Sequence, residues 1–370
     1  MQTYVWTLPT RIFHWMLVVY IVLMFLTSET ESFLNIHAAF GYGVGILIIF
    51  RIFWGFIGPK YSKFAEWPLS IKEIIEFILN FSNTKKIYTG HNPAASFVML
   101  GIIVTVLFAT LTGILTYGIQ EGRGVLSFLN SSFFKEMELF EEIHEFFANF
   151  LLLLVGIHII GVIVDRLLHS KINTLSSMIT GYKNIEADPA SLNFFQKLFA
   201  VIMLLFAILI PLYATTFDSG LTSSRFVPVN YENEHSLFVD ECSACHTLYP
   251  PFLLPTNSWK KLMATLQDHF GDDASLEKED RISIEKFLLA NSASNSTKEA
   301  AFYITESLKG KKDIIAITKT PYWIGKHKNL DRDIFISSSI KSKANCKACH
   351  KDIEQGLIED SSIKIPNSGV

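Results

Sequence analysis

All four cysteines of the chain lie in two copies of one pattern, Cys-x-x-Cys-His, at residues 242–246 and 346–350. This pattern is the attachment signal for c-type haem, in which two thiols add to the porphyrin vinyl groups and the adjacent histidine binds the iron. The pattern predicts two covalent haems, with attachment residues and proximal ligands at Cys242, Cys245, Cys346, Cys349, His246 and His350.

Other uses of a cysteine pair explain the pattern less well. A four-cysteine zinc site needs no histidine after each pair, and a thioredoxin-like redox pair does not need to occur twice. No cysteine remains for a disulfide. Because haem of this type is generally attached outside the cytoplasm, both motifs should lie on the far side of a membrane.

The composition is that of a chain with a membrane-embedded part. Hydrophobic residues make up 49% of the sequence, charged residues only 18%, and phenylalanine is abundant at 31 residues. A soluble chain of this length is more polar. The net charge of −3 gives no indication of nucleic-acid binding. The apolar residues are concentrated before about residue 217, and the remainder is typical of a soluble domain.

Five segments have about the ~20 apolar residues that a membrane helix needs. They are Ile12–Thr27, Ile36–Ile57, Ala94–Tyr117, Ile143–Leu168 and Leu198–Phe217. The first has the length of a signal-peptide core, but it contains a histidine and lacks a cleavage site after it, which predicts a retained helix. Tryptophans near the span ends are typical of interfacial aromatics: Trp6, Trp15, Trp54 and Trp67.

The basic residues predict the orientation of these spans. Lysine and arginine are concentrated in the loops after spans two and four, whereas glutamates predominate after spans one and three. Cytoplasmic loops carry the excess of basic residues, so the N-terminus should be cytoplasmic. Five spans then place everything after Phe217 in the periplasm of a bacterial inner membrane, where the two haem motifs belong.

Histidines inside membrane spans are candidates for function by default. Span four contains His144 and His158, which are fourteen residues apart. This spacing returns to within about 40° of the same helix face after a rise of about 21 Å. His37 in span two matches the depth of His144, and His14 in span one matches that of His158. We therefore expect an outer and an inner b haem, each with two histidine ligands; the alternative is hydrogen-bonded packing residues.

Three further polar residues lie at or near the inner ends of the spans. Arg51 follows His37 by fourteen residues and could neutralise the propionates of the inner haem; the alternative is an arginine that reaches the cytoplasmic surface. His91 precedes span three and is expected in a loop or cap, with a place beside quinone as the alternative. His169 is expected to be a polar end of span four.

Residues 1–185 resemble the bacterial cytochrome b561 family, which includes the cytochrome b subunits of membrane hydrogenases. The resemblance implies a four-helix di-haem b core that exchanges electrons with quinone. It rests on Val5-Trp6-Thr7-Leu8-Pro9-Thr10-Arg11, Phe13-His14-Trp15, His37 with Gly41-Tyr42, Arg51-Ile52-Phe53-Trp54-Gly55-Phe56-Ile57-Gly58-Pro59, Gly90-His91-Asn92-Pro93, His144 and His158.

The soluble segment offers few second ligands for its two haems. His235, His269 and His327 remain, and Met263 is its one methionine, so at most one haem could have histidine and methionine ligands. His269 is predicted to end a helix at Ser258–Phe270 that Gly271 caps, and His327 to lie in a short helix opened by Thr320-Pro321. We favour these two as distal ligands, with His235 in reserve; which serves which haem is open.

The same segment is similar to a family of small periplasmic di-haem cytochromes c, which implies two bis-histidine haems with His269 and His327 as distal ligands. The matching pieces are Glu241-Cys242-Ser243-Ala244-Cys245-His246, Tyr249-Pro250-Pro251, Leu254-Pro255, Ser258-Trp259, Asp268-His269-Phe270-Gly271-Asp272, Thr320-Pro321-Tyr322-Trp323, His327 and Asn345-Cys346.

The sequence thus predicts an all-α protein with a four-helix di-haem b bundle (1–190), a fifth tethering helix with its connector (191–234) and a mostly helical di-haem cytochrome c domain (235–370). We expect electrons to pass from quinol through two b haems and two c haems to a soluble periplasmic acceptor, such as a haem protein. If this is an enzyme, it is a quinol:cytochrome c-type oxidoreductase.

Three alternatives to this function stay open. Electrons could flow from a periplasmic donor to quinone. A c haem without its distal histidine could bind O₂, NO or peroxide. The membrane part could also be an anchor whose b sites are empty.

Overall fold

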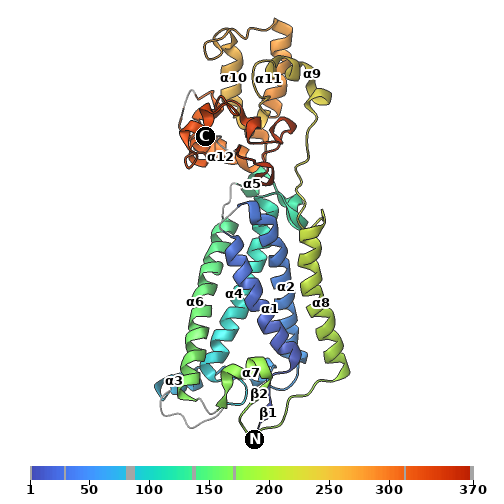
Figure 1. Cartoon of the computed structure of the whole chain (residues 1–370), viewed down its shortest axis with the longest axis vertical. Helices are drawn as coiled ribbons and strands as arrows, with labels where there is room; N and C mark the ends of the chain where they lie inside the picture. Colours follow the sequence, from blue (N-terminus) through green and yellow to red (C-terminus); the bar gives the residue numbers. More distant parts are fainter. Residues whose placement is uncertain are drawn as a thin grey trace. The chain divides into compact units, whose positions relative to one another are not determined.

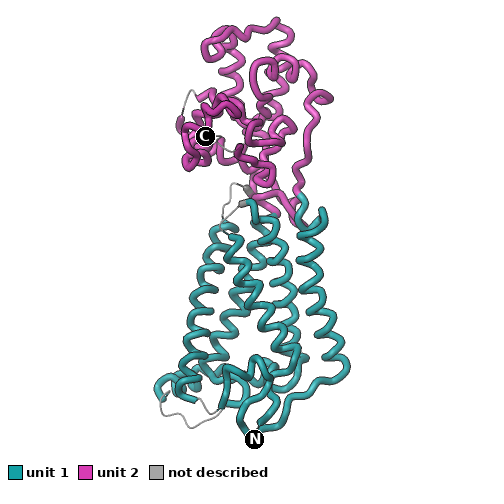
Figure 2. Tube along the Cα trace, in the orientation of Figure 1, with its two compact units in different colours: residues 1–117, 138–223 teal, residues 118–137, 224–370 magenta. Residues whose placement is uncertain are grey.

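The computed structural model describes residues 2–28, 31–80, 88–135, 139–169, 172–311 and 314–366. The described chain is mostly helical and has a two-stranded antiparallel sheet. It divides into two compact units, one of residues 1–117 and 138–223 and the other of residues 118–137 and 224–370 (Figure 2). The all-α fold class is confirmed.

Five helices of the first unit are long and apolar enough to cross a membrane, as predicted (Figure 1). Their ends differ from the expected ones where local chemistry extends a helix. The fifth begins before Leu198 because Asn193 and Gln196 form a capping box with the backbone at its start. The five are α1 (Leu8–Thr27), α2 (Leu34–Ile57), α4 (Pro93–Ile119), α6 (Leu139–Leu168) and α8 (Phe194–Thr216).

Helix α2 packs closely against α1 and α8. A Cβ atom on Gly43 of α2 would lie 2.7 Å both from Pro211 of α8 and from the ring of Tyr20 of α1. Tyr20 also donates a hydrogen bond of 2.9 Å to the carbonyl oxygen of Ala207. The fifth span is therefore packed into the first unit as well as leading to the second. Helices α4 and α6 approach the other spans less closely.

The N-terminal segment is attached to the chain that follows α6. Strands β1 (Thr3–Tyr4) and β2 (Tyr182–Lys183) pair antiparallel, with Thr3 opposite Lys183. Gly181 has a φ of +91°, and a Cβ there would lie 2.4 Å from the ring of Tyr4, so this turn requires glycine. Two short helices complete the loops at this end, α3 (Ile71–Leu79) and α7 (Thr174–Thr180).

The interfacial role predicted for the tryptophans is wrong for three of the four. Trp6, Trp54 and Trp67 are at most 6% exposed, whereas Trp15 is 46% exposed. The reason is polar and aromatic packing inside the protein: Trp54 donates a hydrogen bond of 3.0 Å to the hydroxyl of Thr10, and the other two cover a histidine described below.

The second unit surrounds one hydrophobic core that includes Phe238, Leu254, Ile284 and Leu288. Its helices, beyond the short α5 (Ser132–Lys135), are α9 (Tyr231–Cys242), α10 (Thr256–Ala264), α11 (Lys278–Ala290), α12 (Glu299–Ser307) and α13 (Pro321–Lys326). The predicted helix opened by Thr320-Pro321 is confirmed, and the Thr320 hydroxyl accepts a hydrogen bond from the backbone N–H of Trp323.

The helix predicted at Ser258–Phe270 is wrong in its second half. Helix α10 ends at Ala264, a 3₁₀ turn follows, and His269 lies outside both. The hydroxyl of Thr265 bonds back to the carbonyl of Lys261, and the N–H of His269 donates to the carbonyl of Asp272. These local bonds replace the helical ladder.

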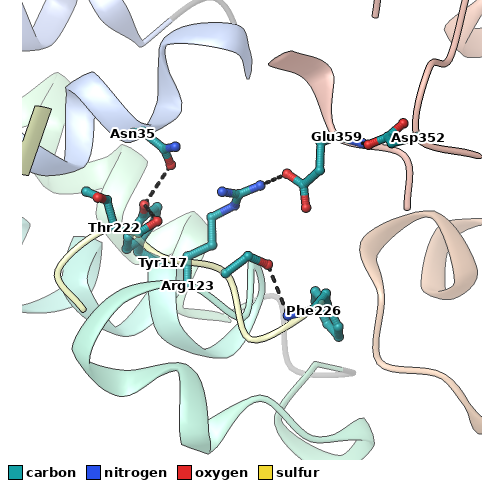
Figure 3. A network of polar contacts seen from close by, with 8 residues as sticks. Asn35, Tyr117, Arg123, Thr222, Phe226, Asp352 and Glu359 are labelled. Carbon is teal, nitrogen blue, oxygen red and sulfur yellow. Dashed lines mark hydrogen bonds and ion pairs between the residues drawn. The ribbon is translucent and has the colours of Figure 1, made fainter. Parts of the chain in front are cut away.

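Residues 118–137, between α4 and α6, belong to the second unit, which no sequence pattern indicated. There Arg123 forms an ion pair with Glu359 (Figure 3). The backbone N–H of Arg225 also donates a 2.9 Å hydrogen bond to the carbonyl of Gly122. The chain between two spans is thus held to the chain that follows the fifth.

Candidate haem-binding sites

The first unit brings the predicted outer pair, His37 of α2 and His144 of α6, together. Their ring centroids are 6.2 Å apart and the rings are nearly perpendicular at 83°. Two imidazoles on one iron, with bonds of about 2.0 Å and about 1.1 Å from each nitrogen to its ring centre, stand about 6.2 Å apart. The spacing therefore fits a metal between the two rings.

Backbone carbonyls orient both outer rings. Nδ1 of His144 lies 2.8 Å from the carbonyl oxygen of Ala109, and Nδ1 of His37 lies 3.1 Å from that of Met24. When Nδ1–H donates to a carbonyl, the lone pair of the imidazole is on Nε2, the nitrogen that would bind a metal. Histidines that bind metals typically have such a hydrogen bond from the ring nitrogen that does not face the metal.

The predicted inner pair, His14 of α1 and His158 of α6, is close enough for the two side chains to interact electrostatically. Nδ1 of His14 is buried and has no hydrogen-bond partner among the described residues. Burying a polar atom without a hydrogen-bond partner costs free energy. The unpaired nitrogen therefore indicates that a bound group completes the site.

Arg51 lies inside the protein instead of reaching the surface, so the surface alternative is wrong. It is 4% exposed, and its guanidinium lies 4.8 Å from the ring centre of Phe64 and 4.9 Å from that of Trp67. His91 lies just before α4 between the rings of Trp6 and Trp67. Burial, together with the charges of Arg51 and a lysine, lowers the pKa of His91 to about 3.

The second unit brings one distal candidate to the first cysteine motif. His246 and His269 have ring centroids 6.2 Å apart and an interplanar angle of 20°. Nδ1 of His246 lies 2.7 Å from the carbonyl oxygen of Thr247, which directs Nε2 toward a metal. The ring of Tyr249 stacks on His246 at 4.6 Å.

The other distal candidate lies beside the second motif. His327 and His350 have ring centroids 6.1 Å apart. Nδ1 of His327 lies 2.8 Å from the carbonyl oxygen of Trp323, whose ring stacks on the imidazole at 4.2 Å. The question left open by the sequence, which histidine faces which motif, is thereby answered: His269 faces His246, and His327 faces His350.

The remaining candidate histidines have other contacts. His235 interrupts α9, its Nδ1 accepts a hydrogen bond from the N–H of Phe238, and its Nε2 lies 3.0 Å from the hydroxyl of Ser283. Both ring nitrogens are engaged, so it does not serve as a reserve ligand. His169 follows α6, with Nδ1 3.2 Å from a carboxylate oxygen of Asp165.

The cysteine environments do not favour thiolates. Burial raises the pKa of Cys242 to about 12 and that of Cys346 to about 11, whereas zinc requires deprotonated sulfur. Within the described ranges, no group of three or more histidine, cysteine or acidic side chains could hold a metal ion. Histidine pairs next to thiol pairs fit haem better than a tetrahedral metal.

Sequence reasoning missed the role of Tyr249. Its ring covers His246 at the first motif, while its hydroxyl donates a 2.6 Å hydrogen bond to the carbonyl oxygen of Ala344, beside the second. Burial, with the nearby Cys346, raises its pKa. The available signals were its position three residues after a motif histidine and its place in the matching piece Tyr249-Pro250-Pro251.

The fold and these paired histidines define a membrane-embedded haem protein of the electron-transfer class. Residues 5–181 match the model of the prokaryotic cytochrome b561 family, and residues 238–358 match that of the dihaem cytochrome c family. The expected resemblance to both families is confirmed, and the families imply both haem b and haem c.

Curated relatives match the membrane half. A probable Ni/Fe-hydrogenase B-type cytochrome subunit of Bradyrhizobium diazoefficiens is 25% identical over 216 residues, which are 50% of this chain and 86% of that protein. A subunit of the same description from Rhizobium leguminosarum is 27% identical over 217 residues, 49% of this chain and 88% of that protein.

Solved structures match the soluble half. The diheme cytochrome c from Rhodobacter sphaeroides is 38% identical, with 35% of this chain and 99% of that chain covered and a TM-score of 0.30. The diheme cytochrome c of Shewanella baltica is 27% identical, with 36% and 94% covered and a TM-score of 0.30.

Proposed function

We propose that this membrane electron-transfer protein carries electrons from quinol to a soluble periplasmic acceptor through four haems. The observation that carries the proposal is that one imidazole separation, 6.1–6.2 Å, recurs at three histidine pairs. The proposed ligands are His14 with His158 and His37 with His144 for two b haems, and His246 with His269 and His350 with His327 for two c haems held by Cys242, Cys245, Cys346 and Cys349.

The proposed role of these residues is to bind and orient the haems, not to react with a substrate. When bound, each haem supplies a one-electron couple, and two histidine ligands per iron leave no coordination position for a substrate. The carbonyl groups of Ala109, Met24, Thr247 and Trp323 fix the Nδ1–H tautomer and direct Nε2 to the iron.

The proposed route crosses the membrane and ends outside. On α6, His158 and His144 are separated by about 21 Å of helical rise, most of a ~30 Å hydrocarbon core. Residues 118–137 and the domain after α8 share one compact unit, and the chain emerges on the same side after its third and fifth spans. This sharing supports the topology in which the c domain is on the side opposite the N-terminus. The basic loops after spans two and four make that side periplasmic.

Haem content and reduction by quinol test the proposal together. Pyridine haemochromes of the purified chain should give two b haems and two c haems; c haem alone would contradict the conduit. In liposomes, a quinol analogue should reduce the c haems of the wild type, and both His14→Ala and His144→Ala should slow this reduction by orders of magnitude.

His169→Ala is the matched control, because this histidine pairs with Asp165 and no proposed haem. Unchanged reduction of the c haems in both ligand variants would show that the proposed path is wrong. If quinol fails to reduce the wild type, while a reduced periplasmic donor reduces quinone through it, the direction is the reverse.

A further inference from the structure

Two cations and a histidine alternate with two tryptophans beside the inner end of the bundle. The guanidinium of Arg51 lies 4.9 Å from the ring centre of Trp67, and that ring lies 4.9 Å from His91. On its other face His91 lies 4.9 Å from Trp6, and the ammonium of Lys183 lies 5.6 Å from the centre of Trp6. We call these five residues the inner stack.

The inner stack has hydrogen-bond donors to spare. Nη1 of Arg51, Nε1 of Trp67 and Nδ1 of His91 are buried, and each is without a partner in the part of the chain that the structure describes. Lys183 is 2% exposed; its ammonium donates to the carbonyls of Thr89 and Gly90, and its third proton remains for another acceptor. These donors come together from four segments of the chain, around residues 51, 67, 91 and 183.

Asp165 is close enough to Lys183 to interact with it electrostatically, but it forms no ion pair with that lysine. The salt bridges among the described residues include neither Arg51 nor Lys183. Two buried cations that form no direct ion pair are destabilising, so the stack favours a further anionic ligand. His91 interacts electrostatically with His158 as well as with both cations, so the stack lies within electrostatic range of the inner histidine pair.

We propose that the inner stack binds the two propionate carboxylates of the inner b haem, through Arg51, Trp67, His91 and Lys183. This inference rests on the proposed function, which includes that haem. The propionate-binding role expected of Arg51 is here extended to Trp67, His91 and Lys183. The positive charge that the stack places beside the haem stabilises its reduced form, so the stack raises the potential of the inner haem above what its two histidines alone would give.

Redox titration of the two b haems in the full chain tests the stack. Lys183→Met removes one cation, and Trp67→Phe removes one N–H donor but keeps a ring, so the second variant preserves packing. Lys183→Met should shift the inner haem about tenfold toward its oxidised form, which is 59 mV lower for a one-electron couple. Trp67→Phe should shift it in the same direction by less, and the outer haem should not change in either variant.

Lys60→Met is the matched control, because this lysine is exposed and pairs with Asp188. It should leave both potentials unchanged. A second experiment replaces the b haems with haem dimethyl ester, which lacks free carboxylates. In that protein, Lys183→Met should no longer shift the potential of the inner haem. If Lys183→Met still shifts the potential of the inner haem when that haem is the ester, the inference is wrong. The inner stack would then bind another anion, such as a lipid phosphate.

Two outcomes separate this inference from the function on which it rests. If both variants leave the inner potential of a protein with two b haems unchanged, the stack does not bind propionates, whereas the four-haem proposal stands. If the wild type contains no b haem, or if His14→Ala retains both, the proposed function itself is wrong.

Discussion

The imidazole of His144 on α6 rests against Gly113 on α4. A Cβ atom on Gly113 would lie 2.9 Å from Cε1 and 3.1 Å from Nδ1 of His144, closer than side chains approach one another. The same ring nitrogen lies 2.8 Å from the carbonyl oxygen of Ala109, one turn earlier on α4. Helix α4 thus holds this ring from two sides, with a carbonyl that orients it and a glycine that makes room for it.

Gly113→Ala should therefore displace His144 and lower the occupancy of the proposed outer b haem. The added methyl group collides with the ring, and a rotated ring loses both its carbonyl contact and its position opposite His37. We expect about half or more of the outer b haem to be lost, measured as b haem per c haem, because metal sites lose about 10–100-fold in affinity when ligand support is removed. The inner haem should remain.

Gly156→Ala on α6 is the control for glycine replacement in a span. A Cβ there would meet nothing within 4 Å, and alanine favours helix by about 1 kcal/mol over glycine in water-exposed helices. Both b haems should be retained. Full retention of the outer haem in Gly113→Ala would mean that the ring can move aside without cost.

If His269 and His327 are the distal ligands that we propose, replacing either one should change ligand binding by the c haems. His269→Ala or His327→Ala opens one coordination position, so each reduced variant should bind CO at one c haem and give a CO-shifted Soret band; the wild type should not. His235→Ala serves as the control, because both of its ring nitrogens are already hydrogen-bonded. CO binding by the wild type would instead favour a haem with an open site.

Much of this organisation could be predicted because it depends on one-dimensional patterns. The cysteine motifs are contiguous, and the spans are runs of apolar residues. The pairing of His37 with His144 needed only helical rise and span direction. In each case, the known geometry of a helix or of a contiguous motif fixes where the residues lie relative to one another.

The rest depends on contacts that no local pattern encodes. His269 and His327 could not be assigned to a motif from sequence, because irregular chain separates each of them from both motifs. Trp6 and Trp67 sit near span ends like interfacial aromatics, but they cover His91 because the N-terminus pairs with the segment after α6. The loop at 118–137 joins the second unit through a backbone hydrogen bond, hydrogen bonds from the guanidinium of Arg225 and one ion pair, which composition does not reveal.

That ion pair, Arg123 with Glu359, predicts measurable coupling in the second unit. The side chains are 17% and 22% exposed, so either single substitution, Arg123→Ala or Glu359→Ala, leaves a partly buried charge and should cost about 1–3 kcal/mol. The double variant should cost less than the sum of the two. A double-mutant cycle on chemical unfolding of the full chain, followed by the c-haem Soret band, measures the coupling.

The pair Lys347 with Glu354, with side chains 55% and 41% exposed, is the surface control. Exposed pairs give about 0.2–1 kcal/mol. A coupling for Arg123 and Glu359 no larger than that of the control pair would mean that the loop is held by its hydrogen bonds, those of Arg225 included, and not by the ion pair.

Lys298 should make the stability of the second unit depend on pH. Its ammonium donates to the carbonyl of Gly356 and lies 4.5 Å from the ring centre of Phe252 and 5.7 Å from that of Phe226. Burial lowers its pKa from 10.5 to about 8, and the charge of Asp352 opposes this shift only in part. Between pH 8 and 10.5 the unfolded chain therefore binds more protons than the folded chain, and the free energy of unfolding should rise with pH over this window.

Each pKa unit corresponds to about 1.4 kcal/mol, so the rise from this residue is at most about 3 kcal/mol. Lys298→Met should abolish it, because methionine fills the same aromatic pocket without a charge. Lys260→Met, at an exposed position of α10, should leave the slope unchanged. Unfolding of the full chain at pH 7, 8, 9 and 10, compared for wild type and both variants, measures the difference. A wild-type slope that survives in Lys298→Met would mean that another group titrates in this window, and that the aromatic pocket tolerates the ammonium at little cost.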